Sequence, residues 1–163
     1  MTATFKVTFG ELKCKRAGKK VIDKACIAKF WDGTGGGDRH GVYVFGVRAG
    51  KGWKPLYVGQ ATKQTLKTRI GQHVGGNGDF NVMLRSVKKG TPVLFLTGRI
   101  GKGKKSTQAI SDIELDFINY AFARNKNLHN DRKIKKPRYV ISGFGGPGKP
   151  AKDVTNLKTM VGY

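Results

Sequence analysis

The sequence predicts a single α/β domain of the α+β type, in which antiparallel strands pack against helices. Two runs rich in β-branched and aromatic residues, 41–47 and 56–59, flank a loop that contains glycine and proline, which is typical of a β-hairpin. A third apolar run at 92–97 predicts a buried strand, and residues 107–124 carry apolar side chains at helical spacing. The chain has 163 residues, which suits one domain because domains commonly have about 100–150 residues.

The elements around the hairpin follow from shorter patterns. The alternating run 5–9 predicts a strand. The glycines of 32–37 predict a linker, since no Lys-Ser or Lys-Thr pair follows them as in a phosphate-binding loop. After the hairpin, Thr62 is expected to cap a helix that ends near Val74, and the apolar residues of 80–87 predict another short helix.

The last third of the chain contains the clearest helix. Ser106 or Thr107 can cap it, and it is expected to reach about Arg124. Residues 140–141 predict a last strand, and the glycines and prolines of 143–150 predict a linker followed by a mobile end.

Composition excludes several classes of protein. Apolar residues make up 38% of the chain, and its 24 glycines bring the total into the globular range. The apolar runs are shorter than the about 18 residues of a membrane span, and the start lacks the apolar stretch of a secretory signal, so we expect a cytoplasmic protein. Cys14 and Cys26 have no His or Cys neighbours at metal-ligand spacing and are expected to be reduced thiols.

Charge points to a polyanionic partner. The chain has 32 Lys and Arg against 10 Asp and Glu, a net charge of +22 that is spread over its whole length. A compact domain with this charge repels itself unless an anion is near, and the usual polyanion is nucleic acid. An anionic membrane is the weaker alternative, since no basic amphipathic helix stands out, and a merely solubilising surface is the third reading.

Five polar side chains stand out against the predicted core. Glu114 falls within the apolar stripe of the long helix, where a carboxylate needs a cation, a metal or hydrogen-bond donors, unless it lies at the edge beside a lysine. Arg69 and His73 are spaced four apart and share one side of their helix, which by itself also fits a solvated basic face. Tyr43 and Tyr57 lie on the two hairpin strands, where core packing is the ordinary role.

Together these residues resemble the GIY-YIG nuclease family. Gly41-Val42-Tyr43, then thirteen residues, then Tyr57-Val58-Gly59 corresponds to the paired tripeptides of the family, with valine for both isoleucines. The remaining positions of the family pattern are matched in order by Arg69, His73, Glu114 and Asn130. Gln60 departs from the pattern, because several members have a lysine there. The match covers residues 41–130.

The resemblance implies a fold and a domain plan. The family fold is a small three-stranded antiparallel sheet flanked by helices, which we expect over residues 39–130. Residues 1–38 are then an N-terminal extension, and 131–163 are a basic C-terminal extension that contains glycine and proline.

The resemblance also implies an activity, namely a metal-dependent DNA endonuclease of phage or restriction type. In this family a single divalent metal, Mg²⁺ or Mn²⁺, is held by the glutamate, here Glu114, while water attacks the phosphodiester in line. Tyr43 is our first choice as general base and Tyr57 the alternative. Arg69 is expected to bind the scissile phosphate, and His73 to hydrogen-bond it or carry a proton. The expected products have a 5′-phosphate and a 3′-hydroxyl.

The resemblance implies that Asn130 positions the other groups of the active site through its side-chain amide. Further contacts to the DNA backbone are expected from two basic clusters, which consist of Lys102, Lys104 and Lys105 and of Arg132, Lys133, Lys135, Lys136 and Arg138. A homo-oligomer is left open as a source of sequence specificity. The rival hypothesis is a non-catalytic basic nucleic-acid-binding protein, for example one associated with RNA, and a third is a degenerate nuclease fold that only binds.

Overall fold

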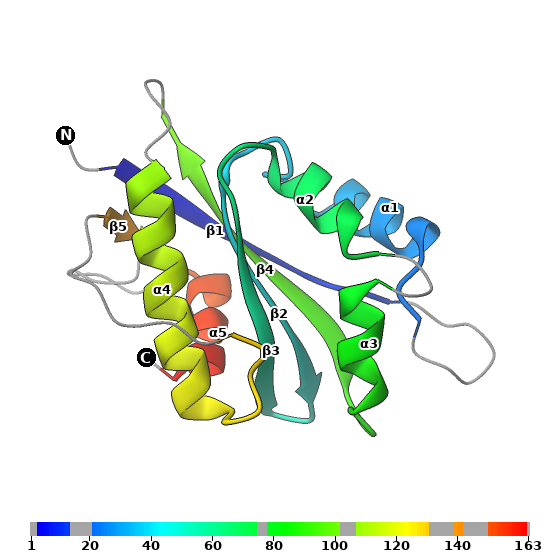
Figure 1. Cartoon of the computed structure of the whole chain (residues 1–163). Helices are drawn as coiled ribbons and strands as arrows, with labels where there is room; N and C mark the ends of the chain where they lie inside the picture. The colour runs from blue at the N-terminus through cyan, green and yellow to red at the C-terminus, as the bar shows by residue number, and fades with distance from the viewer. Residues whose placement is uncertain are drawn as a thin grey trace.

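A five-stranded sheet forms the centre of the molecule (Figure 1). The computed structural model describes residues 3–13, 21–74, 78–101, 107–130, 139–141 and 150–162. The sheet has the strand order β3-β2-β4-β1-β5, and all its neighbours are antiparallel except β1 and β5. The strands are β1 (Ala3–Glu11), β2 (Gly41–Ala49), β3 (Gly52–Ala61), β4 (Thr91–Ile100) and β5 (Tyr139–Ile141).

The α/β class predicted from the sequence is confirmed, but the prediction of three strands is wrong. The predicted sheet corresponds to β3, β2 and β4. On its far side β1 pairs with β4 from Thr4 opposite Ile100 to Glu11 opposite Val93, and β5 adds to β1. The residues of β4 are buried on both faces of the sheet, so its second edge also needs a partner, and the alternating run near the N-terminus supplies it. The segment 1–38 thus contributes a strand to the same sheet.

Five helices in the described part of the chain cover both faces of the sheet. Helices α1 to α3 lie on one face, and α4 and α5 lie on the other (Figure 1). The helices are α1 (Lys24–Gly33), α2 (Leu66–Gln72), α3 (Asp79–Arg85), α4 (Thr107–Arg124) and α5 (Lys152–Val161).

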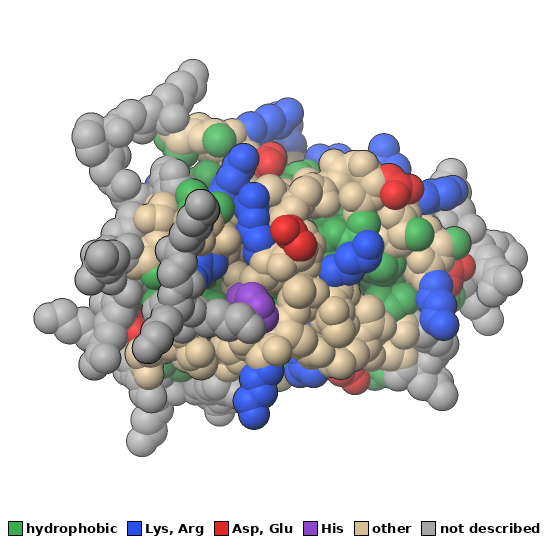
Figure 2. Space-filling view, turned by 90° about the horizontal axis from the view of Figure 1, so that it is seen from above, with side chains coloured by type: hydrophobic (Ala, Val, Ile, Leu, Met, Phe, Trp, Pro, Cys, Tyr) green, Lys and Arg blue, Asp and Glu red, His purple; other side chains and the backbone are tan. Residues whose placement is uncertain are grey.

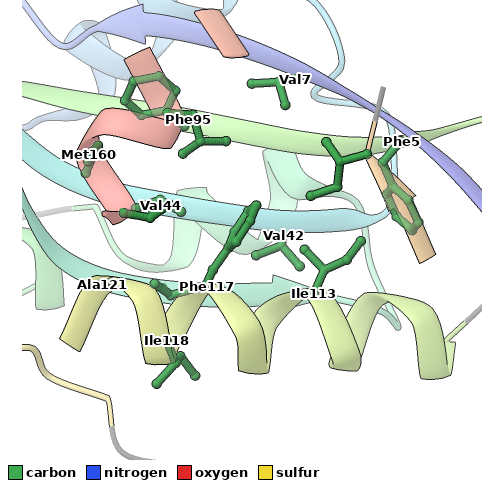
Figure 3. Packing of buried hydrophobic residues seen from close by; sticks show 14 of the residues in the cluster. Phe5, Val7, Val42, Val44, Phe95, Ile113, Phe117, Ile118, Ala121 and Met160 are labelled. Atoms are coloured by element: carbon green, nitrogen blue, oxygen red, sulfur yellow. The ribbon is translucent and has the colours of Figure 1, made fainter. Parts of the chain in front are cut away.

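The alternation of β2 divides the interior into two clusters. Val42 and Val44 point to the face covered by α4 and α5, where Figure 3 shows them beside Phe117. Tyr43 and Phe45 point to the other face, against α1, α2 and α3. Each buried side chain of this size stabilises the fold by about 1.5–3 kcal/mol. The same alternation places the Tyr43 hydroxyl on the face covered by α2 and α3, which defines the candidate site.

Two local predictions are corrected by the structure. Helix α2 begins at Leu66 rather than after Thr62, because the Thr65 hydroxyl accepts a hydrogen bond from the Thr68 backbone N–H at 3.2 Å and caps the helix. The hairpin loop is shorter than expected, since β3 already begins at Gly52. Gly50, with φ +58°, makes this tight turn possible.

The two remaining helices were not expected. Helix α1 fills the stretch before the glycine linker and is capped by Asp23, whose carboxylate accepts from the Cys26 N–H at 2.8 Å. Helix α5 lies where a mobile end was predicted, because an apolar stripe follows the Gly/Pro segment and packs on the core. This stripe consists of Val154, Leu157, Met160 and Val161.

Cysteine chemistry also differs from the prediction. Cys26 is disulfide-bonded in the structure, so the expectation of a reduced thiol is wrong for it, while Cys14 lies outside the described residues. The prediction rested on the spacing of cysteine and histidine along the sequence, which does not show which residues the fold brings together.

Over the ranges that the structure describes, no helix is long and apolar enough to span a membrane.

Candidate active site

The Tyr43 hydroxyl is the centre of a buried polar cluster. Tyr43 lies on β2 with no exposed surface, and its Oη is 2.7 Å from Nε2 of His73, the residue that ends α2. Arg69, one turn earlier on α2, is near enough for its positive charge to act on the pKa of the same phenol. The ring of Tyr57 on β3 lies 6.1 Å from the Tyr43 ring and 5.8 Å from the imidazole, measured between centroids. Four of the predicted site residues therefore meet on one face of the sheet.

The glycines of the two tripeptides have steric roles in this arrangement. A Cβ at Gly59 would overlap the hydroxyl end of Tyr43 and lie 2.8 Å from Tyr57 Cε1, so only glycine leaves room for both phenols. A Cβ at Gly41 would overlap the Thr97 carbonyl oxygen on the neighbouring strand. The two tyrosine rings pack beside the backbone of Gly59, where β3 carries no side chain. This packing requires glycine at that position of the motif.

His73 is held on three sides. Its Nε2 contacts Tyr43, and its Nδ1 is 2.8 Å from Oδ2 of Asp79, the first residue of α3. The imidazole stacks on Phe80 at 5.1 Å with an interplanar angle of 16°. Asp79 was not recognised from the sequence. The sequence marks Asp79 only by its position. It is an acidic residue, followed by a large apolar one, and it comes directly after the glycine-rich loop that follows His73.

Burial shifts the pKa values of both groups toward their neutral forms. Burial raises the pKa of Tyr43 far above its ordinary value, the negative charge that Tyr57 would carry adds to this, and Arg69 opposes it. Burial lowers the pKa of His73, and the charge of Arg69 lowers it further, whereas the hydrogen bond that Asp79 accepts from the imidazole raises it. Near neutral pH the phenol therefore keeps its proton and the imidazole is uncharged.

Asn130 lies at the outer edge of the sheet beside the same tyrosines. Its amide oxygen accepts from the Val58 N–H and its amide nitrogen donates to the Val58 carbonyl, both at 2.8 Å. Val58 lies between Tyr57 and Gly59 on β3, which is an edge strand of the sheet. The Asn130 amide thus takes the hydrogen bonds that a neighbouring strand would make at this point.

Glu114 lies on α4, on the opposite face of the sheet from Tyr43, Arg69 and His73. Its side chain is only 4% exposed. Helix α4 runs along β3, where the Ser111 hydroxyl donates to Gln60 Oε1 at 3.1 Å. Between Ser111 and Glu114 the helix advances about 4.5 Å along its axis. One residue of a strand spans about 3.3 Å, so this advance corresponds to little more than one residue of β3. Glu114 is therefore nearly level with Gly59, on the far side of the edge strand.

The donor set of Glu114 is compatible with a hard cation. Mg²⁺ is commonly bound by one or two carboxylates and completes its shell with water and phosphate oxygens. Within the described ranges no group of three or more His, Cys, Asp or Glu forms a closed metal centre. A single carboxylate can hold such a cation only with further ligands from water or from another molecule, and it does not suit a structural zinc ion.

The basic clusters predicted to follow the DNA backbone, Lys102 to Lys105 and Arg132 to Arg138, lie outside the described residues. On the face shown in Figure 2, other Lys and Arg side chains are spread widely rather than gathered in one patch.

Comparison of the chain with protein-family models, with curated proteins and with solved structures finds no significant match. The geometry of the site therefore carries the functional argument.

Proposed function

We propose that this protein is a metal-dependent DNA endonuclease of the GIY-YIG type. The observation that carries the proposal is the buried Tyr43 hydroxyl, which lies 2.7 Å from Nε2 of His73, near Arg69, and beside the glycine of the second tripeptide. Core packing alone does not require a histidine, an arginine and a second tyrosine to gather around one buried phenol. The net charge of +22 supports a nucleic acid as substrate.

Tyr43 acts on the attacking water in this proposal. Because burial raises its pKa, the phenol cannot lose its proton to solvent beforehand. It can accept the proton of the water as it passes its own proton to Nε2 of His73, which is 2.7 Å away. Tyr57 lies close enough to orient the water or to take part in the same network.

Arg69 has the position and the chemistry to bind the scissile phosphate. It is only partly buried, and its Nη1 donates to Gln72 at 2.9 Å, so the guanidinium reaches from the buried phenol toward the surface. A guanidinium offers two parallel donors to a phosphate, and its charge stabilises the extra negative charge of the transition state.

Glu114 is the residue that would hold the divalent metal. When bound, Mg²⁺ or Mn²⁺ neutralises phosphate charge and stabilises the leaving oxygen. Asn130 holds the edge of β3 at Val58, the point around which residues from the two faces of the sheet must reach one substrate.

The test is cleavage of plasmid DNA with Mg²⁺, with EDTA as control. We expect nicking or cutting that needs the metal and is lost in Glu114→Gln, which keeps the shape of the side chain and removes its charge. Asp112→Asn is the matched control, because Asp112 is also buried on α4 but lies about 200° around the helix from Glu114. Tight binding of intact plasmid by the unmodified protein would favour the non-catalytic nucleic-acid-binding alternative.

A phage or restriction origin, a cytoplasmic location and a homo-oligomeric state stay predictions. Sequencing the ends produced from genomic DNA tests the first of these, since a restriction-type enzyme leaves one defined sequence at every end. The expected ends carry a 5′-phosphate and a 3′-hydroxyl.

A further inference from the structure

We propose that Asp79 is a positioning residue, which holds His73 in the one tautomer that can accept the proton of Tyr43. The tautomer itself follows from the contacts of the folded chain. Its effect on the rate of DNA cleavage rests on the proposed function.

The hydrogen-bond partners decide the tautomer. An ionised carboxylate can only accept hydrogen bonds, so Nδ1 of His73 must carry a proton to bond Asp79 Oδ2 at 2.8 Å. A neutral imidazole has one N–H, which leaves Nε2 as an acceptor. The hydroxyl of Tyr43, 2.7 Å from Nε2, is then the donor. Without Asp79, Nε2 could carry the proton instead, and the phenol would have no acceptor there.

The charged and titratable groups around the imidazole come from four elements. Tyr43 faces it from β2, Tyr57 from β3, Arg69 from α2 and Asp79 from α3. Arg69 disfavours a charged imidazole, and Asp79 favours it. The parallel ring of Phe80 packs on the imidazole and keeps its plane aligned with both hydrogen bonds.

The proton balance of the step is simple. The attacking water gives a proton to the Tyr43 oxygen while the Tyr43 proton moves to Nε2 of His73. The phenol ends neutral and the imidazole becomes an imidazolium. The hydroxide oxygen bonds to phosphorus as the bond from phosphorus to the 3′ oxygen breaks, and the 3′ oxygen leaves with that electron pair and takes a proton from solvent to become the 3′-hydroxyl. Asp79 then stabilises the imidazolium through the Nδ1–H that it already binds. A carboxylate that orients a histidine in this way acts through the histidine and does not touch the substrate.

Asp79 is suited to this role and poorly suited to a purely structural one. Its side chain is 66% exposed, so its hydrogen bond with His73 adds little to stability. It also lies in the first turn of α3, where a negative charge stabilises the helix by about 0.3–1 kcal/mol. Asp153 likewise lies in the first turn of α5. The variant Asp153→Asn therefore also removes a stabilising negative charge from the start of a helix, but it leaves the contacts of His73 unchanged.

The first experiment is ¹⁵N NMR of the imidazole nitrogens in the full-length protein. We expect the Nδ1–H tautomer for His73 in the unmodified protein and in Asp153→Asn, and a shift toward the Nε2–H tautomer in Asp79→Asn. The pKa of His73, measured in the same samples, should be lower still in Asp79→Asn, because the carboxylate that raises it is gone. An Nε2–H tautomer in the unmodified protein, or an unchanged one in Asp79→Asn, overturns the proposal whether or not the protein cuts DNA.

The second experiment measures the rate of plasmid cleavage across pH. We expect a loss of about 10–100-fold in Asp79→Asn, partial recovery in Asp79→Glu, and no change in Asp153→Asn. The loss should be accompanied by a changed pH profile, which weaker folding alone would not produce. A full rate in Asp79→Asn rejects the catalytic part of the proposal, whereas an inactive unmodified protein rejects the nuclease and leaves the NMR result to decide on Asp79.

Discussion

Gly59→Ala tests the steric basis of the site with a single methyl group. The Cβ of alanine would overlap the hydroxyl end of Tyr43 and lie 2.8 Å from Tyr57 Cε1. Tyr43 is fully buried between strands and helices, so its ring has nowhere to move without disturbing its neighbours. The phenol must shift away from Nε2 of His73, which breaks a buried 2.7 Å hydrogen bond.

The magnitude combines two costs. Forcing an extra carbon into a packed interior costs about 1–3 kcal/mol, and leaving a buried polar atom without its partner costs about 1–3 kcal/mol. The two overlap, because moving the phenol relieves the clash while it breaks the bond, so we expect the free energy of unfolding to fall by about 2–4 kcal/mol. Domains are commonly stable by about 5–15 kcal/mol, so the variant should still fold.

Gly71→Ala is the matched control for this variant. Gly71 lies in α2, and a Cβ there has no atom within 4 Å. Alanine in a helix is favoured over glycine by about 0.5–1 kcal/mol, so this variant should be as stable as the unmodified protein or more so. Urea unfolding followed by circular dichroism gives both numbers, and plasmid cleavage should be lost in Gly59→Ala alone. Equal stability and activity in the two variants would refute the packing of the phenols over Gly59.

Two further predictions concern the groups beside this packing. Because burial lowers the pKa of His73, the unfolded chain takes up its proton at a higher pH than the folded one. The free energy of unfolding should therefore fall as pH drops below about 6.5, the ordinary histidine pKa, until the folded pKa is passed; urea unfolding at several pH values should show a smaller fall in His73→Gln. Asn130→Asp replaces the amide donor to the Val58 carbonyl by an oxygen and should cost about 1–3 kcal/mol. Asn127→Asp is its control at an exposed position, and equal urea midpoints for the two variants would contradict the edge contact.

The sequence predicted those parts of the fold that depend on local patterns. Alternation placed Tyr43 and Tyr57 on adjacent strands, and helical spacing gave the long helix that carries Glu114. The extra strand β1 was recognised as a strand, but its partner was not, because pairing depends on which edges of the sheet remain open. Helix α5 was missed for a related reason, since its short apolar stripe has meaning only once a core is present to receive it.

The candidate site shows the same division. The motif located Arg69 and His73 one helical turn apart, and the structure places His73 against the Tyr43 hydroxyl with Arg69 near it. Asp79 could not be found by spacing, because it reaches His73 across a loop and from another helix. The pKa shifts could not be predicted either, since they arise from burial that only the packed α2 and α3 create.

The proposed function requires residues from both faces of the sheet to reach one substrate around its edge, and β3 is an edge strand. Tyr43 and Arg69 lie on one face, and Glu114 lies on the other. A central strand has a neighbouring strand on each side, whereas among the described strands β3 is paired only with β2. An open edge pairs readily with other chains, and Asn130 satisfies both backbone groups of Val58 with a side chain that is far smaller than a strand. Asn130 thus prevents another strand from pairing at Val58, which is the point around which the proposed site would reach its substrate.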